Sequence, residues 1–144
     1  MTTVEGSGGT SLHPIHSILL AFPVALFVSG LVTDIAYLNT SVIQWSTFSS
    51  WLIVGALVFG GLAGAWAIVA AMFPHRMTRG RALTFVGALA VMWIAGLINA
   101  FQHSHDGWAS VGALGLSLSI ISSLFSLIAA AIGYSSQPAR GIVR

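Results

Sequence analysis

Four long apolar stretches restrict what this chain can fold into more than any other feature of its sequence. They cover about residues 15–34, 51–73, 82–102 and 109–134. A membrane-spanning helix needs about 20 mostly apolar residues at a rise of about 1.5 Å each, and every stretch is long enough. The apolar residues run continuously instead of alternating with polar ones, which argues against the strands of a β-barrel. The stretches therefore predict an all-α fold, an integral membrane up-down four-helix bundle.

The scarcity of charged side chains supports a membrane environment. The 144 residues include five Lys or Arg and three Asp or Glu, and 56% of the residues are hydrophobic. The mean hydropathy is +0.93. A soluble domain of this size must cover much of its surface with polar groups, and disordered chains are polar and charged, so both classes are excluded. Cysteine is absent, which excludes disulfides and thiolate metal sites.

The polar segments beside the apolar stretches define the expected domain organisation. Residues 1–12 have the Gly, Ser and Thr content of a flexible tail, residues 13–136 form the transmembrane domain, and residues 137–144 form a second tail. The connectors between spans are expected at 39–50, 74–81 and 102–108. Because these links are short, consecutive helices should lie antiparallel to one another.

The arginines predict the orientation of the spans. With four spans, all five positive side chains fall on the same side of the membrane as the N-terminus: Arg76, Arg79, Arg81, Arg140 and Arg144. The positive-inside rule makes this side the cytoplasm. We therefore expect both termini in the cytoplasm and a bacterial inner membrane as the location. The net charge of +2 then reports topology, and a nucleic-acid partner is not expected.

Polar side chains gather in two clusters at opposite ends of the expected bundle. Spacing of three or four residues places His16 and Asp34 on one face of the first span. An intramembrane carboxylate seldom stays unpaired, so Asp34 should meet the polar end of the third span. The outer cluster comprises Asp34, Asn99, Gln102, His103, His105 and Asp106, and the inner cluster comprises His13, His16 and His75.

The outer cluster admits more than one interpretation. Imidazole and carboxylate groups are good ligands for zinc, copper, nickel or iron, and a metal site here would use Asp34, His103, His105 and Asp106. The helix would have to end between the two histidines, since residues two apart on a helix diverge. In the alternative, a hydrogen-bonded cap, Asp34 accepts from His103 or Asn99 and fastens the first span to the third. A proton relay is a third interpretation.

The inner cluster is open to similar alternatives. His13 and His16 lie on one helical turn, where they could ligate a metal ion or supply an axial haem ligand, with His75 as a further candidate. The alternative is a polar helix start at the level of the lipid headgroups, where His13 satisfies free backbone N–H groups.

In combination, these residues resemble a bacterial membrane family called "domain of unknown function 2231". The resemblance rests on HPIH at 13–16, AFP at 21–23, VTDIAY at 32–37, Trp45 with Phe48-Ser49, NAFQHSHDG at 99–107 and GLSLS at 115–119. It implies a four-span membrane protein. It also suggests an electron-transfer context, because members of this family are often joined to redox modules.

The chain departs from the family pattern at the start of the third span. Related sequences often carry a histidine around Phe85, which would face a first-span histidine and complete a bis-imidazole haem site. This chain lacks that partner, so the resemblance supports a haem site only if His75 takes the second position.

The sequence favours a non-enzymatic role. No Ser-His-Asp ordering, phosphate loop or HExxH motif is present. The leading hypothesis is a small accessory component of a membrane electron-transfer system that binds haem b or a transition-metal ion. The alternative is a non-catalytic structural or assembly subunit of a larger membrane complex. The expected partners are the lipid bilayer, other membrane subunits or redox proteins, and, through the GxxxG motif of Gly60 and Gly64, a second copy of the chain.

Overall fold

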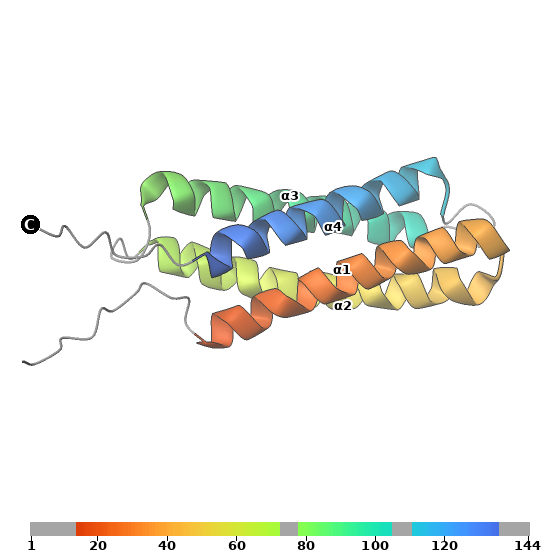
Figure 1. Ribbon diagram of the computed structural model, residues 1–144, viewed down its shortest axis with the longest axis horizontal. Helices are drawn as coiled ribbons and strands as arrows, with labels where there is room; N and C mark the ends of the chain where they lie inside the picture. Colours follow the sequence, from red (N-terminus) through yellow and green to blue (C-terminus); the bar gives the residue numbers. More distant parts are fainter. Residues whose placement is uncertain (1–13, 73–77, 105–110, 136–144) are drawn as a thin grey trace, which may run out of the picture.

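A computed structural model describes residues 14–72, 78–104 and 111–135, and this part of the chain forms four long helices (Figure 1). They are α1 (Pro14–Thr40), α2 (Ile43–Ala71), α3 (Arg79–His103) and α4 (Ala113–Tyr134). Each helix is long and apolar enough to cross a membrane. The all-α four-helix membrane bundle expected from the four apolar stretches is confirmed.

Some of the predictions fall on residues that the structure does not describe. The two expected tails lie outside the described residues, as do the candidate site residues His13, His75, His105 and Asp106.

The helices run along the long axis of the molecule (Figure 1), each packed against its neighbours in sequence, and α4 also packs against α1. We call the end where α1 passes into α2 the outer end, and the opposite end, where α1 begins and α4 finishes, the inner end. Helices α1 and α3 are thus diagonal partners, and contacts between them pass through the middle of the bundle.

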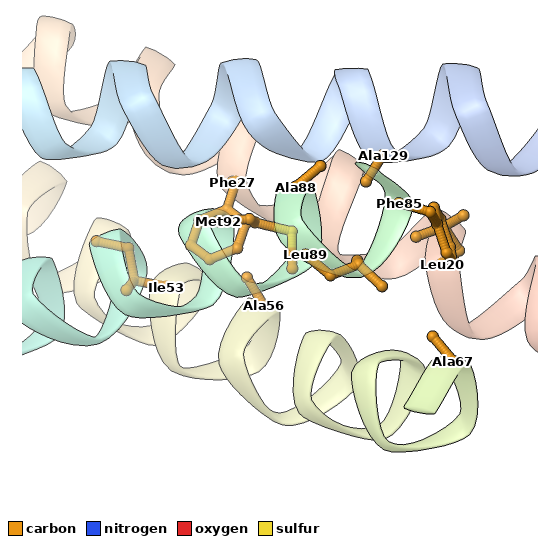
Figure 2. Close-up of a cluster of buried hydrophobic side chains, with 10 residues drawn as sticks. All are labelled: Leu20, Phe27, Ile53, Ala56, Ala67, Phe85, Ala88, Leu89, Met92 and Ala129. Carbon is orange, nitrogen blue, oxygen red and sulfur yellow. The ribbon is translucent and has the colours of Figure 1, made fainter. Parts of the chain in front are cut away.

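The middle of the bundle is apolar and closely packed (Figure 2). Phe27 of α1 and Met92 of α3 lie there with almost no exposed surface. Glycines make room for them: a Cβ on Gly96 would lie 2.5 Å from Phe27 Cζ, and a Cβ on Gly60 would lie 2.9 Å from Met92 Cε. Small residues let helix backbones approach in lipid, where packing holds helices together. Gly60 of the GxxxG motif therefore serves packing within the chain, while Gly64 faces open space.

The expected connector over 39–50 is wrong, because α1 extends to Thr40 and α2 begins at Ile43. The polar residues of this segment fit a helix because their hydroxyls bond to the helix itself: Thr47 Oγ1 donates to Ile43 O at 3.3 Å, and Ser50 Oγ donates to Ser46 O at 2.9 Å. Ser41 makes the tight turn between the helices with a φ of 56°.

Candidate functional site

Four polar side chains from three helices meet near the outer end of the bundle. Asp34 Oδ1 of α1 lies 2.9 Å from His103 Nε2 of α3, and Ser119 of α4 donates its hydroxyl to Asp34 Oδ2. Asn99 Nδ2 donates to Ser119 Oγ at 2.7 Å, and His103 Nδ1 lies 3.0 Å from the Asn99 carbonyl oxygen. One bond uses the Asn99 side chain and another uses the Asn99 backbone carbonyl, so the four bonds form a closed ring. We call Asp34, Asn99, His103 and Ser119 the outer ring.

The outer ring lies inside the protein, not on its surface. Asp34 and Asn99 have 0% of their surface exposed, and His103 has 9%. The expected contact between Asp34 and the polar end of the third span is confirmed. Gln102, which the sequence placed in the same cluster, is half-buried and takes no part in the ring.

The observed bonds have the geometry of the hydrogen-bonded cap. Asp34 and His103 contact each other directly, and both ring nitrogens of His103 face an oxygen. Within the described residues, no group of three or more His, Cys, Asp or Glu side chains is suited to hold a metal ion. Two of the four predicted ligands, His105 and Asp106, lie outside these residues, so the metal site stays a prediction.

Further hydroxyls fasten α1 to its two neighbours. Ser123 Oγ of α4 donates to Phe27 O at 2.9 Å, and Ser49 Oγ of α2 donates to Gly30 O at 3.2 Å. Together with the outer ring, these bonds tie the outer half of α1 to all three other helices. Bonds of this kind help to hold helices together where lipid offers no polar partner.

Sequence reasoning missed the part that Ser119 plays in the outer ring. It assigned the serines of α4 to close packing, because a hydroxyl in a helix often bonds to its own backbone. Ser122 does so, with its Oγ 2.8 Å from Leu118 O. The available signal was the position of Ser119 on the small-residue face of α4, at the depth of Asp34.

At the inner end, His16 of α1 points into the bundle. Its exposed fraction is 2%, and neither ring nitrogen has a hydrogen-bond partner among the described residues. The ring lies against two aromatic side chains, with centroid distances of 6.2 Å to Trp66 of α2 and 5.8 Å to Phe85 of α3. Phe85 is thus an α3 residue that packs against His16.

Also at the inner end, Arg81 of α3 is hydrogen-bonded to the end of α4. Its Nη2 donates to the Ile132 carbonyl oxygen at 2.5 Å, to Ser135 Oγ at 2.6 Å and to the Ser135 carbonyl oxygen. A cation at a helix C-terminus satisfies free carbonyl groups and complements the helix dipole. The sequence identified Arg81 only as a topology signal, so this contact between α3 and the end of α4 is a second role that it missed.

Four apolar helices with buried polar contacts between them define an integral membrane four-helix bundle. The chain belongs to the family of predicted membrane proteins called domain of unknown function 2231, whose model matches residues 12–140. The resemblance drawn from the sequence motifs is thereby confirmed. No curated protein and no solved structure matches the chain.

Proposed function

We propose that the protein is a small accessory component of a membrane electron-transfer system, which binds a haem or a transition-metal ion through His16. One observation carries this proposal: His16 is buried, and within the part of the chain that the structure describes neither of its ring nitrogens has a hydrogen-bond partner. Bound haem or metal would supply the one-electron chemistry, and His16 would supply a ligand.

A stability argument alone does not account for His16. A buried polar group without a partner destabilises a fold by about 1–3 kcal/mol, and a leucine would fill the same apolar space without that penalty. A neutral imidazole nitrogen with a free electron pair is, however, a standard ligand of iron and other transition metals. The aromatic rings of Trp66 and Phe85 make the surroundings of His16 apolar, and a haem would bring the other donors that its iron needs.

The orientation is part of the same proposal. Arg79 and Arg81 stand at the start of α3, at the end of the bundle where His16 lies. By the positive-inside rule, we propose that this end and both termini face the cytoplasm of a bacterial inner membrane. A redox partner would then reach the His16 site from the cytoplasmic side. His13 and His75, the other inner ligands predicted from the sequence, lie outside the described residues.

The test is the visible spectrum and metal content of the full chain, purified in detergent from cells supplied with haem. We expect a Soret band or a stoichiometric metal in the wild type, and its loss in His16→Leu. His103→Gln is the matched control, because it alters a histidine at the other end and should leave the cofactor in place. A wild type with neither haem nor metal would refute the proposal. Loss of the cofactor in His103→Gln alone would move the site to the outer cluster.

A second candidate is the non-catalytic structural or assembly subunit of a larger membrane complex. It is supported only by the structural role of the outer ring, whose bonds join α1, α3 and α4 within the chain and serve the fold directly. This role predicts a partner subunit that co-purifies in fixed stoichiometry with a cofactor-free chain. It also predicts that His16→Leu leaves that association unchanged.

A further inference from the structure

We propose that the outer ring is a proton-binding site, in which Asp34 and His103 share one proton and form an electrically neutral unit. This inference does not depend on a cofactor at His16. It follows from the direction of each hydrogen bond in the ring and from the charges that surround it.

All but one of the bonds in the ring have a fixed direction. The Asn99 carbonyl oxygen can only accept, so His103 Nδ1 must carry a hydrogen. Ser119 Oγ accepts from Asn99 Nδ2, so the single hydroxyl hydrogen of Ser119 is free to go to Asp34 Oδ2.

The remaining bond joins Asp34 Oδ1 to His103 Nε2 at 2.9 Å. Two lone pairs would repel each other at this distance, so one hydrogen must lie between the two atoms. If it belongs to the nitrogen, the pair is an imidazolium and a carboxylate. If it belongs to the oxygen, the pair is a neutral imidazole and a carboxylic acid. Either way, the pair holds one proton more than a neutral histidine beside an ionised aspartate, and its net charge is zero.

The surroundings favour this neutral state. Helices α2 and α4 contain no Asp, Glu, Lys, Arg or His. The other charged or imidazole side chains of the helices are His16 of α1 and Arg79 and Arg81 of α3, all at the inner end. His16 is 18 residues before Asp34, which is about 27 Å along a helix.

Tyr37, one turn beyond Asp34, is the remaining titratable group near the ring within the described residues, and a phenol cannot carry a positive charge. No described cationic side chain therefore lies close enough to balance a negative charge on Asp34. The shared proton is left to do so. An unpaired buried carboxylate is strongly unfavourable.

The position of the ring suits exchange of this proton with one side of the membrane. His103 is the last residue of α3, so the ring lies close to the outer end, although the side chains of His103 and Asp34 are both buried, with exposed fractions of 1% and 0%. A proton that arrives at the imidazole can pass to the carboxylate within the 2.9 Å bond, without any change in the net charge of the site.

The proton can be observed directly with the full chain in detergent at neutral pH. Wild-type minus Asp34→Asn infrared difference spectra report whether Asp34 is a carboxylic acid, and 15N NMR, with His103→Gln for assignment, reports whether His103 is an imidazolium. We expect one of these two signatures. An ionised Asp34 beside a neutral His103, with or without a metal ion between them, overturns the proposal.

Asp34→Asn should fold, because the amide can accept from Ser119 and donate to a neutral His103. Two serine variants provide a matched test that does not rely on it. Ser119→Ala removes the bond to Asp34 Oδ2 and should shift the Asp34 carboxyl or carboxylate band. Ser123→Ala removes a buried hydroxyl that bonds to Phe27 O, outside the ring, and should leave the band unchanged. Equal effects of the two serine variants would also overturn the proposal.

Discussion

At the scale of single residues, His16 stands out because burial of its polar imidazole lowers the stability of the fold. In the absence of a cofactor, replacing it by leucine removes from an apolar environment two nitrogens that have no hydrogen-bond partner in residues 14–72, 78–104 and 111–135. His16→Leu should therefore raise the free energy of unfolding of the cofactor-free protein by about 1–3 kcal/mol.

Thermal or denaturant unfolding in the same detergent measures this change. Leu20→Ala, at a fully buried apolar position one turn further along α1, should instead destabilise the protein, because it leaves a cavity. If His16→Leu destabilised the protein to a similar extent, His16 would have a partner that its surroundings in the described residues do not reveal.

The sequence anticipated some residue contacts and not others, for a physical reason. The bond between Asp34 and His103 was predictable, because a carboxylate in a membrane needs a partner and few are present. The bond between Ser119 and Asp34 was not, because a serine can satisfy its hydroxyl within its own helix. The direction of His16 was equally open, since residues near a helix start can face lipid headgroups or the bundle.

At the scale of helices, close approach of α1 and α3 depends on a glycine. Gly96→Ala would place a Cβ 2.5 Å from Phe27 Cζ, and the ring is held in the packed core. We expect a loss of about 1–3 kcal/mol in stability, as for other overpacked cores. Gly64→Ala is the matched control, since a Cβ at this position meets nothing within 4 Å.

Unfolding of the two glycine variants in detergent tests this prediction. A Gly96→Ala protein as stable as Gly64→Ala would show that α1 and α3 do not pack as described. A change of oligomeric state in Gly64→Ala alone would indicate that the open face of α2 contacts a second copy of the chain.

The contact between α1 and α3 at the inner end suggests a gain-of-function variant. Phe85→His would set a second imidazole opposite His16, where the rings of Phe85 and His16 are 5.8 Å apart. Two imidazoles can ligate haem from opposite faces, so we expect a higher haem affinity than in the wild type.

Haem titration followed by visible absorption measures this affinity. Phe101→His is the matched control, because Phe101 also lies on α3 but is 63% exposed, and it should leave the affinity unchanged. Equal affinities of the Phe85→His and wild-type proteins would count against a haem position between α1 and α3.

The helices themselves were largely predictable, because the length of an apolar run decides whether it can span a membrane. The start of α2 was not. The polar residues after Ile43 read as a connector, yet their hydroxyls bond to carbonyl groups of α2 itself or, in the case of Ser49, to α1. Serine and threonine are common both in loops and at helix ends. The position at which α2 begins therefore depended on packing against α1, which the sequence does not show.

At the scale of the whole molecule, two polar sites are separated by a layer of buried and largely apolar side chains. The outer ring lies on one side and His16 on the other, with buried side chains such as Phe27, Met92 and Ile53 between them. Liposomes that contain the protein and a trapped pH dye should therefore hold a pH gradient as long as protein-free liposomes do. Rapid collapse of the gradient in the presence of the protein would show that the layer admits water.

This layer of buried side chains is a low-dielectric medium between the two polar sites. A charge added at His16 and a charge removed from the outer ring would be separated by a low-dielectric medium and would experience different fractions of the membrane voltage. The occupancy of each site would then respond to the voltage as well as to its own ligand.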